Sequence, residues 1–327
     1  MLRVVLSRLR AKKKARKRGT GLMWLVRRGS FRLKLAEGIH DAQYDAIFYT
    51  DCMEVLYGLH PVEEALKAGK RRFDHVLVAR EREDARVERV VALCRQAGVR
   101  VRQEPREQLT VVAKTPAHQG VVALVRAQEM LTIEDLFEPL GSDGGARLLL
   151  ALDGVEDPQN LGALLRVADG AGVDGVVLTE RRSAPLSPVA IKASAGATEH
   201  LRIARVVNLV RALEELKKRN LWIIGLDERG TSDYDRFDMT GDCVLVLGRE
   251  GAGLHDLVRK TCDHLLRIPM AGGVSSLNVS AAGAVVLYEA FRQRRAKAFG
   301  VDGRGAMGAR HADPGASKPR KQKGLGS

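Results

Sequence analysis

Between residues 148 and 297, short apolar runs alternate with longer segments whose apolar residues recur every three or four positions. A continuous apolar run bounded by turn residues predicts a buried strand, and a period of 3.6 predicts a helix. Alternation over this length indicates a mostly parallel sheet with helices on both faces, in which ligands bind at the carboxyl ends of strands. We expect strands at 148–152, 175–179, 201–203, 221–225, 244–247 and 265–268, and helices at 161–171, 188–195, 207–219, 254–260 and 277–297.

A smaller α/β unit precedes this one, at residues 54–127. Its first helix is expected near 60–66, with Pro61 in the first turn, where the missing N–H has no helical partner to lose. The same patterns predict strands at 75–79, 99–101 and 119–125, and a helix at 86–97. Residues 128–147 are rich in Gly and Pro and are predicted to be a linker. Residues 1–53 and 299–327 are predicted to be a flexible basic extension and a disordered basic tail.

Charge is distributed unevenly along the chain. The net charge is +14, yet residues 1–36 alone contribute +13 and residues 292–327 contribute +8, which leaves −7 for the middle. Cationic ends favour polyanions such as RNA through counterion release, although tails of this kind can also serve solubility alone. In the small unit, Lys70, Arg71 and Arg72 form a local cationic run that is either an RNA contact or an ordinary solvated loop.

Cysteine use and hydropathy favour a cytoplasmic protein. The 4 cysteines form no CxxC pair, and no His lies at metal-ligand spacing from two of them, so we read them as reduced thiols. No apolar stretch approaches the roughly 18 residues that a membrane span needs, and residues 1–10 lack the apolar region of a secretion signal. The Arg-rich start suits an organellar transit peptide, a bacterial extension or an early start codon, and we favour the last two.

The first of three polar loops follows the strand at 148–152. The run DPQNLGALLR extends from Asp157 to Arg166 and opens a helix. We expect Asn160 to cap that helix, because an amide oxygen can accept a hydrogen bond from a first-turn N–H. Arg166 lies six residues further on. Taken alone, the loop is more typical of a plain cap followed by a solvated helix residue than of a functional site.

The other two loops follow the strands at 244–247 and 265–268. The first, LGREGAGL from Leu247 to Leu254, carries three glycines that let a ligand or a neighbouring backbone come close. Its spacing is GxxGxG, which differs from the GxGxxG of dinucleotide folds and makes a nicotinamide-dependent oxidoreductase remote. The second, IPMAGGVSSLNVSAAG from Ile268 to Gly283, enters a helix that we expect Ser275 or Ser276 to cap. Its Asn278 and Ser280 could also serve only local backbone groups.

Together, these three motifs resemble those of the SpoU family of S-adenosylmethionine-dependent RNA 2′-O-methyltransferases. The resemblance spans about 148–295 and is carried by DPxNxGxxxR, LGxEGxGL and IPMxGxxxSLNVSxAxG. Residues 54–126 resemble the family's small RNA-binding domain, which is related in fold to ribosomal L30e-type proteins. The start YGLHPV, from Tyr57 to Val62, is close to the form in the 23S rRNA guanosine-2′-O-methyltransferases of the RlmB type.

The resemblance implies a fold that periodicity cannot show. Family members fold as an α/β sheet whose carboxyl-terminal part is threaded through a loop as a trefoil knot (the SPOUT fold), although knots are otherwise rare. It further implies a homodimer with the cofactor in the knot near the subunit interface. Carried over by motif, the S-adenosylmethionine site comprises Gly248, Ile268 and Leu277, with Leu247 and Met270 alongside, and no metal is required.

The catalytic set implied by the resemblance is Asn160, Arg166, Glu250, Ser276 and Asn278. Arg166 is the family's activator of the ribose hydroxyl. Because a guanidinium pKa lies at about 12.5 or above, a cationic Arg166 that grips a phosphate and stabilises the developing alkoxide is easier to defend than a literal base. Asn160 is expected to position Arg166 or the ribose, Glu250 to orient the loop or Arg166, and Asn278 to hold the knot loop.

Two other functions stay open at this stage. The chain could methylate transfer RNA, because the small domain favours ribosomal RNA as the substrate but does not exclude transfer RNA. It could also be an RNA-binding assembly factor without chemistry, against which the intact Asn160, Arg166, Glu250 and Asn278 argue. The sequence does not identify the target nucleotide. Few aromatic residues are available for stacking (4%), so recognition of RNA shape and phosphates is expected.

Overall fold

The structure is a computed structural model and describes residues 24–27, 30–35, 38–39, 53–82, 84–128, 130–137 and 146–299. The chain divides into two compact units, Met1–Cys52 and Met53–Ser327. In the first unit the backbone forms an antiparallel sheet that the sequence did not predict, made of β1 (Trp24–Arg27), β2 (Ser30–Leu35) and β3 (Gly38–Ile39). The predicted flexibility of the remainder of 1–53 and the predicted disorder beyond 299 fall outside the described residues.

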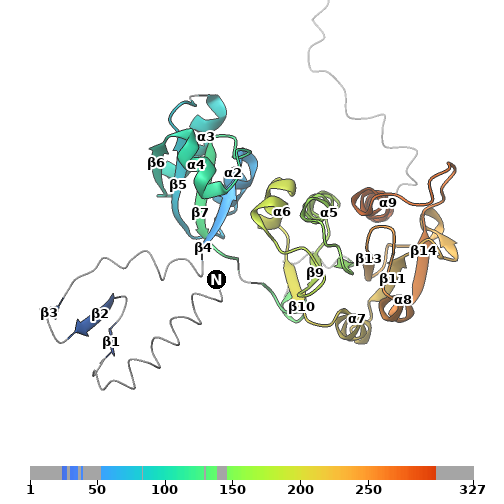
Figure 1. Cartoon of the computed structure of the whole chain (residues 1–327). Coiled ribbons are helices and arrows are strands. Elements are labelled where there is room, and N and C mark those ends of the chain that lie inside the picture. Colours follow the sequence, from blue (N-terminus) through green and yellow to red (C-terminus); the bar gives the residue numbers. More distant parts are fainter. Residues whose placement is uncertain are drawn as a thin grey trace, which may run out of the picture. The chain divides into compact units, whose positions relative to one another are not determined.

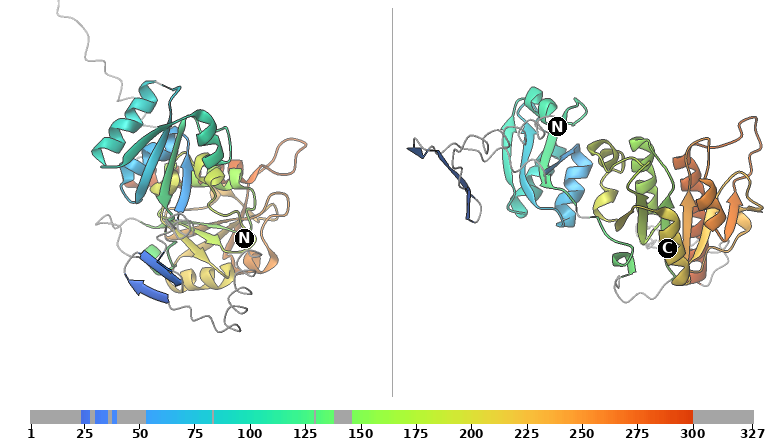
Figure 2. Two further views of the ribbon diagram at one scale, coloured as in Figure 1. Left: turned by 60° about the vertical axis from the view of Figure 1, so that its left-hand side comes forward. Right: turned by 60° about the horizontal axis from the view of Figure 1, so that its bottom comes forward.

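The second unit begins with a four-stranded mixed sheet in the order β4-β7-β5-β6. Its strands are β4 (Met53–Tyr57), β5 (Phe73–Ala79), β6 (Arg100–Glu104) and β7 (Val121–Arg126). Helices α2 (Leu59–Ala68) and α3 (Ala85–Gln96) cover one face, and α4 (Arg106–Ala113) covers the other, so each face has its own apolar core. Figure 2 shows this sheet between its helices. We call residues 53–126 the N-terminal domain.

A seven-stranded sheet follows, and every pairing in it is parallel. Its order is β10-β9-β8-β13-β11-β14-β12. The strands are β8 (Leu148–Leu152), β9 (Gly175–Thr179), β10 (Ile203–Val206), β11 (Trp222–Leu226), β12 (Ser232–Asp233), β13 (Cys243–Leu247) and β14 (His264–Arg267). The predicted α/β class is thereby confirmed. Because neighbouring strands run the same way, the loops after β8, β13, β11 and β14 leave the sheet at one edge, the carboxyl edge.

Helices cover both faces of this sheet (Figure 1). Odd and even residues of β8 enter different cores, Leu150 with α5 and α9 on one face and Leu149 with α7 on the other. This is the period-two burial of a strand packed on both sides. The helices are α5 (Pro158–Gly170), α6 (Pro188–Ala193), α7 (Leu209–Lys218), α8 (Asp256–Thr261) and α9 (Val279–Phe299). We call residues 146–299 the C-terminal domain.

The segment predicted to be a linker is only partly one. Leu131 pairs with the edge of the seven-stranded sheet, donating to Ile203 O at 3.0 Å and accepting from Arg205 N at 3.2 Å. Ile133 and Leu136, in and beside the short helix η1 (Asp135–Phe137), are buried in the core under α7. Gly- and Pro-rich composition therefore concealed a short apolar anchor, and residues 138–145 lie outside the described range.

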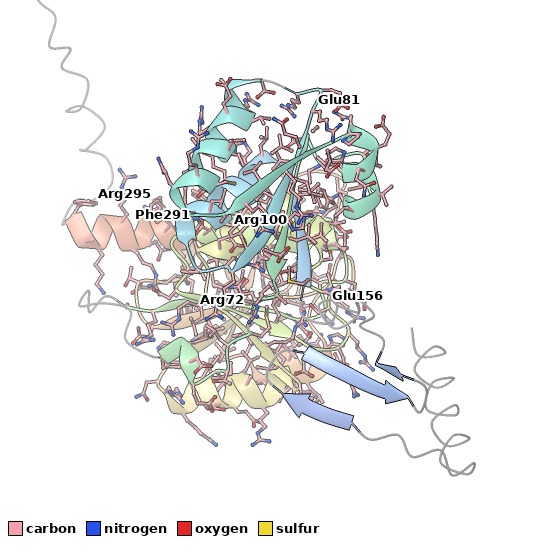
Figure 3. All side chains as sticks on the ribbon, turned by 90° about the vertical axis from the view of Figure 1, so that its left-hand side faces the viewer. Arg72, Glu81, Arg100, Glu156, Phe291 and Arg295 are labelled. Carbon is pink, nitrogen blue, oxygen red and sulfur yellow. The ribbon has the colours of Figure 1, made fainter. Side chains whose placement is uncertain are left out.

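A buried ion cluster joins the two domains. Arg71 donates from Nε and Nη2 to the two carboxylate oxygens of Glu199, each at 2.9 Å, and from Nη1 to Glu54. The side chains of Arg71 and Glu199 are 4% and 1% exposed. Glu199 lies in η2 (Ala197–Glu199) of the C-terminal domain. Both interpretations of the run Lys70, Arg71 and Arg72, an RNA contact or a solvated loop, are therefore wrong for Arg71, whereas Arg72 is exposed (Figure 3).

Helix α6 completes this junction. Ile191, which belongs to α6, is 2% exposed and packs within the core of the N-terminal domain. Its neighbour Lys192 donates to Ala117 O at 2.5 Å and lies 5.3 Å from the centre of the Tyr57 ring. Apolar burial, a cation–π contact and a bidentate ion pair thus hold the two domains together.

The cysteines within the described residues are shielded from solvent to different degrees. Cys94 and Cys243 are buried and Cys262 is partly buried, and burial raises the pKa of Cys94 to about 11 and that of Cys262 to about 12. Cys52 lies outside the described range. Among the described residues no helix has the length and apolar character to cross a membrane.

Candidate active site at the carboxyl edge

The three motif loops meet at the carboxyl edge of the seven-stranded sheet. Each loop leaves a strand there: 153–157 after β8, 248–255 after β13 and 268–278 after β14. The first two strands are direct neighbours, and β11 alone separates β13 from β14. Parallel pairing therefore brings together residues that lie 90 and 118 positions apart in the chain.

Asn160, Glu250 and Asn278 form one hydrogen-bonded cluster. Asn160 Nδ2 donates to Glu250 Oε1 at 2.7 Å, and Asn278 Nδ2 donates both to that oxygen and to Asn160 Oδ1, the latter at 3.1 Å. A carboxylate can only accept, so both amide NH₂ groups face it and the orientation of each amide is fixed. We call these three residues the edge cluster. It ties the three loops to one another, with Asn160 half-buried and Glu250 and Asn278 exposed.

Two predicted helix caps are wrong. The cap of α5 is Asp157, whose side chain accepts from Asn160 N at 2.9 Å, and this leaves the amide of Asn160 free to join the edge cluster. The start of α9 is bonded by Asn278, whose Oδ1 accepts from Ser280 N at 2.9 Å and Ser280 Oγ at 2.6 Å. Asn278 therefore caps the helix with its side-chain oxygen and bonds the cluster with its side-chain nitrogen. Ser275 and Ser276 do not cap the helix, and both are exposed.

A cavity of about 750 Å³, open to solvent, lies beside the edge cluster. Every residue that the sequence assigned to the cofactor lines it, and so do two of the predicted catalytic residues: Leu247, Gly248, Ile268, Met270, Leu277, Glu250 and Ser276. Its apolar walls and few polar groups suit a small organic molecule, since ligand pockets of about 300–1,000 Å³ are typical. Among the described residues no group of His, Cys, Asp or Glu side chains could hold a metal ion.

Gly248 explains how the wall of this cavity can be built from bare backbone. A Cβ at this position would lie 2.3 Å from the carbonyl carbon of Gly253, closer than real atoms approach. The loop closes on itself because Arg249 N donates to Gly253 O at 3.0 Å and Gly253 N donates to Arg249 O at 3.1 Å. Glycine at 248 is therefore required for the turn that presents Glu250 to the cluster.

A fourth loop, 227–229 after β11, also lines the cavity and was not predicted from the sequence. Its Asp227 side chain is 0% exposed and accepts from Arg229 Nε at 2.8 Å, Arg229 Nη2 at 3.0 Å and Arg229 N at 3.0 Å. Burial raises the pKa of Asp227, but the hydrogen bonds from Arg229 outweigh it and hold the pKa below its usual value. The available signal was the polar run Asp227-Glu228-Arg229 directly after an apolar strand.

Arg166 is not brought to the edge cluster. It is exposed on α5, and within the described part of the chain no group bonds its guanidinium. It lines a different recess of about 760 Å³, together with His60 and Glu64 of α2 and His200. Because it lies six helical residues further on, its side chain leaves the helix about 120° around the axis from that of Asn160. Of the five predicted catalytic residues, one chain therefore assembles Asn160, Glu250 and Asn278, places Ser276 beside them and leaves Arg166 apart.

Two family models match this chain. Residues 147–288 match the SpoU rRNA Methylase family, and residues 55–131 match the RNA 2′-O ribose methyltransferase substrate-binding domain. The two matched segments correspond closely to the C-terminal and N-terminal domains of the structure. All three motif loops lie within the first match.

Curated relatives and solved structures agree with these matches. The 23S rRNA (guanosine-2′-O-)-methyltransferase RlmB of Pseudomonas syringae pv. tomato is 42% identical over 245 residues, which cover 75% of this chain and 98% of that protein. RlmB of Vibrio vulnificus is 41% identical over 243 residues, covering 74% and 98%. The crystal structure of the SpoU methyltransferase AviRb from Streptomyces viridochromogenes, in complex with the cofactor AdoMet, is similar with a TM-score of 0.64 and 26% identity, covering 75% of this chain and 91% of that one.

Proposed function

This chain belongs to the SpoU rRNA methylase family, and from that premise we propose that it methylates the ribose 2′-hydroxyl of a guanosine in 23S rRNA, using S-adenosylmethionine. The observation that carries the proposal is the meeting of three separate loops: the cofactor residues inferred from the motifs line one cavity, and the edge cluster adjoins it. Support for the substrate comes from the RlmB relatives, whose names specify 23S rRNA and guanosine.

The cavity fits the proposed cofactor. Leu247, Ile268 and Leu277 offer apolar surface, and the loop held by Gly248 brings backbone N–H and C=O groups to the wall without a side chain in the way. Glu228, which is exposed at the cavity, adds a carboxylate that could accept from the hydroxyls of a ribose. When bound, the cofactor supplies a methyl group on a positively charged sulfur that is already activated for transfer.

The residues of the chain would then act by alignment. Orienting two reacting groups correctly can contribute on the order of 7–11 kcal/mol to catalysis. In our proposal Asn160 and Asn278 fix Glu250, and the edge cluster sets the wall of the cavity against the target ribose. Ser276 lies on that wall and positions the same loop. Glu250 and Asn278 are exposed and Asn160 is half-buried, so solvent reaches the cluster and its groups can exchange a bond within it for one to the substrate.

Arg166 has a separate part in the proposal. We assign it the grip on a neighbouring phosphate and the stabilisation of negative charge on the ribose oxygen. Because Arg166 lies apart from the edge cluster within one chain, the proposed homodimer is the arrangement that would let a second copy bring the two together. The trefoil knot that the resemblance implies stays a prediction. We further propose that the N-terminal domain and the basic ends hold the RNA, and that the protein acts in the cytoplasm.

A methylation assay on separate RNA pools tests this proposal. Full-length protein would be incubated with methyl-labelled S-adenosylmethionine and 23S rRNA, 16S rRNA or bulk tRNA. We expect label in 23S rRNA, recovered as 2′-O-methylguanosine after digestion, and none of it with Asn160→Ala. Label confined to tRNA would mean that the substrate is tRNA and not 23S rRNA. A protein that binds RNA but transfers no methyl group to any pool would be an assembly factor instead.

A further inference from the structure

A second recess opens at the carboxyl edge, on the β9 side of the edge cluster. It has a volume of about 1130 Å³ and is formed by the ends of β8 and β9, the loop after β9 and the starts of α7 and α8. None of the motif residues assigned above to cofactor or catalysis lines it. We call it the β9 groove.

Two arginines give the β9 groove its charge. Arg181 and Arg182 are exposed, and within the described residues neither has a hydrogen-bond or ion-pair partner. Arg182 has a φ of 55°, in the left-handed region that non-glycine residues adopt rarely and that often marks functional sites. The conformation is held in place because Ala184 N donates to Val155 O at 2.8 Å. The loop after β9 is thus bonded to the loop that leads to Asn160.

The floor of the groove offers further groups to an anion. His255 lies there and donates from its backbone N and from Nδ1 to Asp153, at 2.7 and 2.9 Å, so that its Nε2 is left to accept from a hydroxyl such as that of a ribose. The hydroxyl of Thr179 is shielded from solvent and has no partner among the described residues. The first N–H groups of α7, at Leu209 and Val210, also line the groove and have no acceptor within the helix.

Acidic groups do not cancel this charge. Of the two carboxylates that line the groove, Asp153 is engaged by His255, and Asp256 accepts from Arg259 Nη2 at 2.8 Å. Val207 and Leu257, which are 69% and 68% exposed, add apolar surface at the same groove. Free cationic groups combined with exposed aliphatic surface suit a strand that carries phosphates along one side and bases or riboses along the other.

The β9 groove and the cofactor cavity adjoin each other. Gly154 separates them: a Cβ there would lie 2.9 Å from Arg249 Cγ, which belongs to the cavity wall, and 3.2 Å from His255 Cε1, which belongs to the groove. A strand whose ribose is presented to the edge cluster would therefore have to cross only this wall of side chains to reach the groove.

We propose that the β9 groove binds backbone phosphates of the RNA strand next to the methylated nucleotide, with Arg181 and Arg182 as positioning residues. This inference rests on the proposed function, because it takes RNA as the substrate. The groove fixes the register in which the strand crosses the carboxyl edge, and it contributes affinity that depends on salt and little on base sequence.

RNA binding by a double variant tests the inference. Arg181→Ala/Arg182→Ala would be compared with wild type for binding to a 23S rRNA transcript across a range of KCl concentrations. Loss of two phosphate contacts should lower the affinity roughly tenfold or more and reduce the slope of log K against log [KCl] by about 1 to 2. Arg181→Lys/Arg182→Lys should recover part of both. The affinity for S-adenosylmethionine should stay unchanged.

The matched control is Lys218→Ala/Lys260→Ala, which removes the same charge from the far ends of α7 and α8, where both lysines are exposed. If the arginine variant and this control bind the transcript with equal affinity and with an equal slope of log K against log [KCl], the proposed binding of RNA in the groove is overturned. If wild type binds the transcript but transfers no methyl group, the proposed function fails, while the difference between the variants still decides the inference.

A cross-linking measurement guards against an indirect effect of the substitutions. A benzophenone label on Val207→Cys in otherwise wild-type protein should cross-link to the transcript on irradiation, because Val207 lies at the groove. The same label on Lys218→Cys should give little product. Equal yields from the two positions would contradict a strand in the groove.

Discussion

The carboxyl edge and the domain junction are both held by polar side chains from distant segments, but they differ in burial. At the edge, Asn160, Glu250 and Asn278 bond one another while Glu250 and Asn278 remain exposed and Asn160 is half-buried. At the junction, Arg71 and Glu199 are almost completely shielded from water. A group that solvent or ligand can reach loses little when its partner is removed, whereas a buried charge without a partner is costly.

The difference indicates what each region does. The edge cluster keeps its polar atoms where a substrate can replace a partner, which suits a site that binds and releases. The junction satisfies its charges internally and fixes the N-terminal domain to the C-terminal domain through Arg71 and α6. Loss of the junction should therefore appear as lost stability, and loss of the edge as lost activity.

The largest effect is expected from Arg71→Ala. It would strand the buried carboxylate of Glu199, and breaking a buried pair from one side typically costs about 3–5 kcal/mol. The free energy of unfolding, from urea titration, would measure it. Arg72→Ala, at the exposed neighbour, is the control and should change stability by less than about 0.5 kcal/mol. Equal effects of the two substitutions would mean that the junction does not hold the domains together.

Gly248→Ala should act on the edge instead. The added Cβ would overlap the backbone at Gly253, so the loop must shift and deform the cavity wall. Because a misplacement of about 1 Å can cost on the order of 100-fold in rate, we expect a loss of that size in kcat/KM together with weaker cofactor binding. Gly272→Ala, where a Cβ meets nothing within 4 Å, should leave both unchanged. Calorimetry with S-adenosylmethionine would check the binding arm.

Glu250→Gln separates charge from shape in the edge cluster. Glutamine retains an oxygen for the amides of Asn160 and Asn278 but loses the charge that strengthens those bonds. Hydrogen bonds to a charged group suggest a fall in methylation rate of about 10- to 100-fold. Thermal unfolding should stay close to that of wild type, because the group is exposed. A large drop in melting temperature at full activity would make the cluster structural.

The smallest expected effect is the dependence of stability on pH that Glu54 contributes. Burial raises the pKa of Glu54 above its ordinary value although Arg71 lowers it. A raised pKa means that the folded state binds the proton more tightly than the unfolded state does. The stabilisation from protonated Glu54 is therefore fully present below the ordinary pKa of 4.5 and is lost as the pH rises through the raised value. Relative to Glu54→Gln, wild type should gain stability between pH 7 and pH 5. No pH dependence of that difference would contradict the assignment.

Much of the fold followed from periodicity, because burial on both faces of a parallel sheet forces long apolar runs. The strands at 148–152 and 175–179 agree residue for residue with β8 and β9. Periodicity failed where few residues are buried: β12 has two residues, and the anchor around Ile133 and Leu136 is a short run just before Pro139 and the glycines at 141, 144 and 145. Arg71 could not be placed, since its partner is 128 positions away.

The site was predictable in membership but not in detail. Motif resemblance selected residues that meet at one cavity. Local capping rules, however, wrongly predicted that Asn160 and Ser276 cap helices. Asp157 and Asn278 are equally good caps by residue type, and only the long-range bonds of the edge cluster decide which amide is free. The fourth loop at Asp227 carries the same signal as the other three, a polar run after an apolar strand.

Mapping of ribose methylation on 23S rRNA, from cells with and without this gene, tests the central claim most directly. A single guanosine should carry a 2′-O-methyl group in the first cells and lack it in the second, and the wild-type gene, but not Asn160→Ala, should restore it. An unchanged methylation pattern in 23S rRNA, with the protein present and folded in the first cells, would contradict the account.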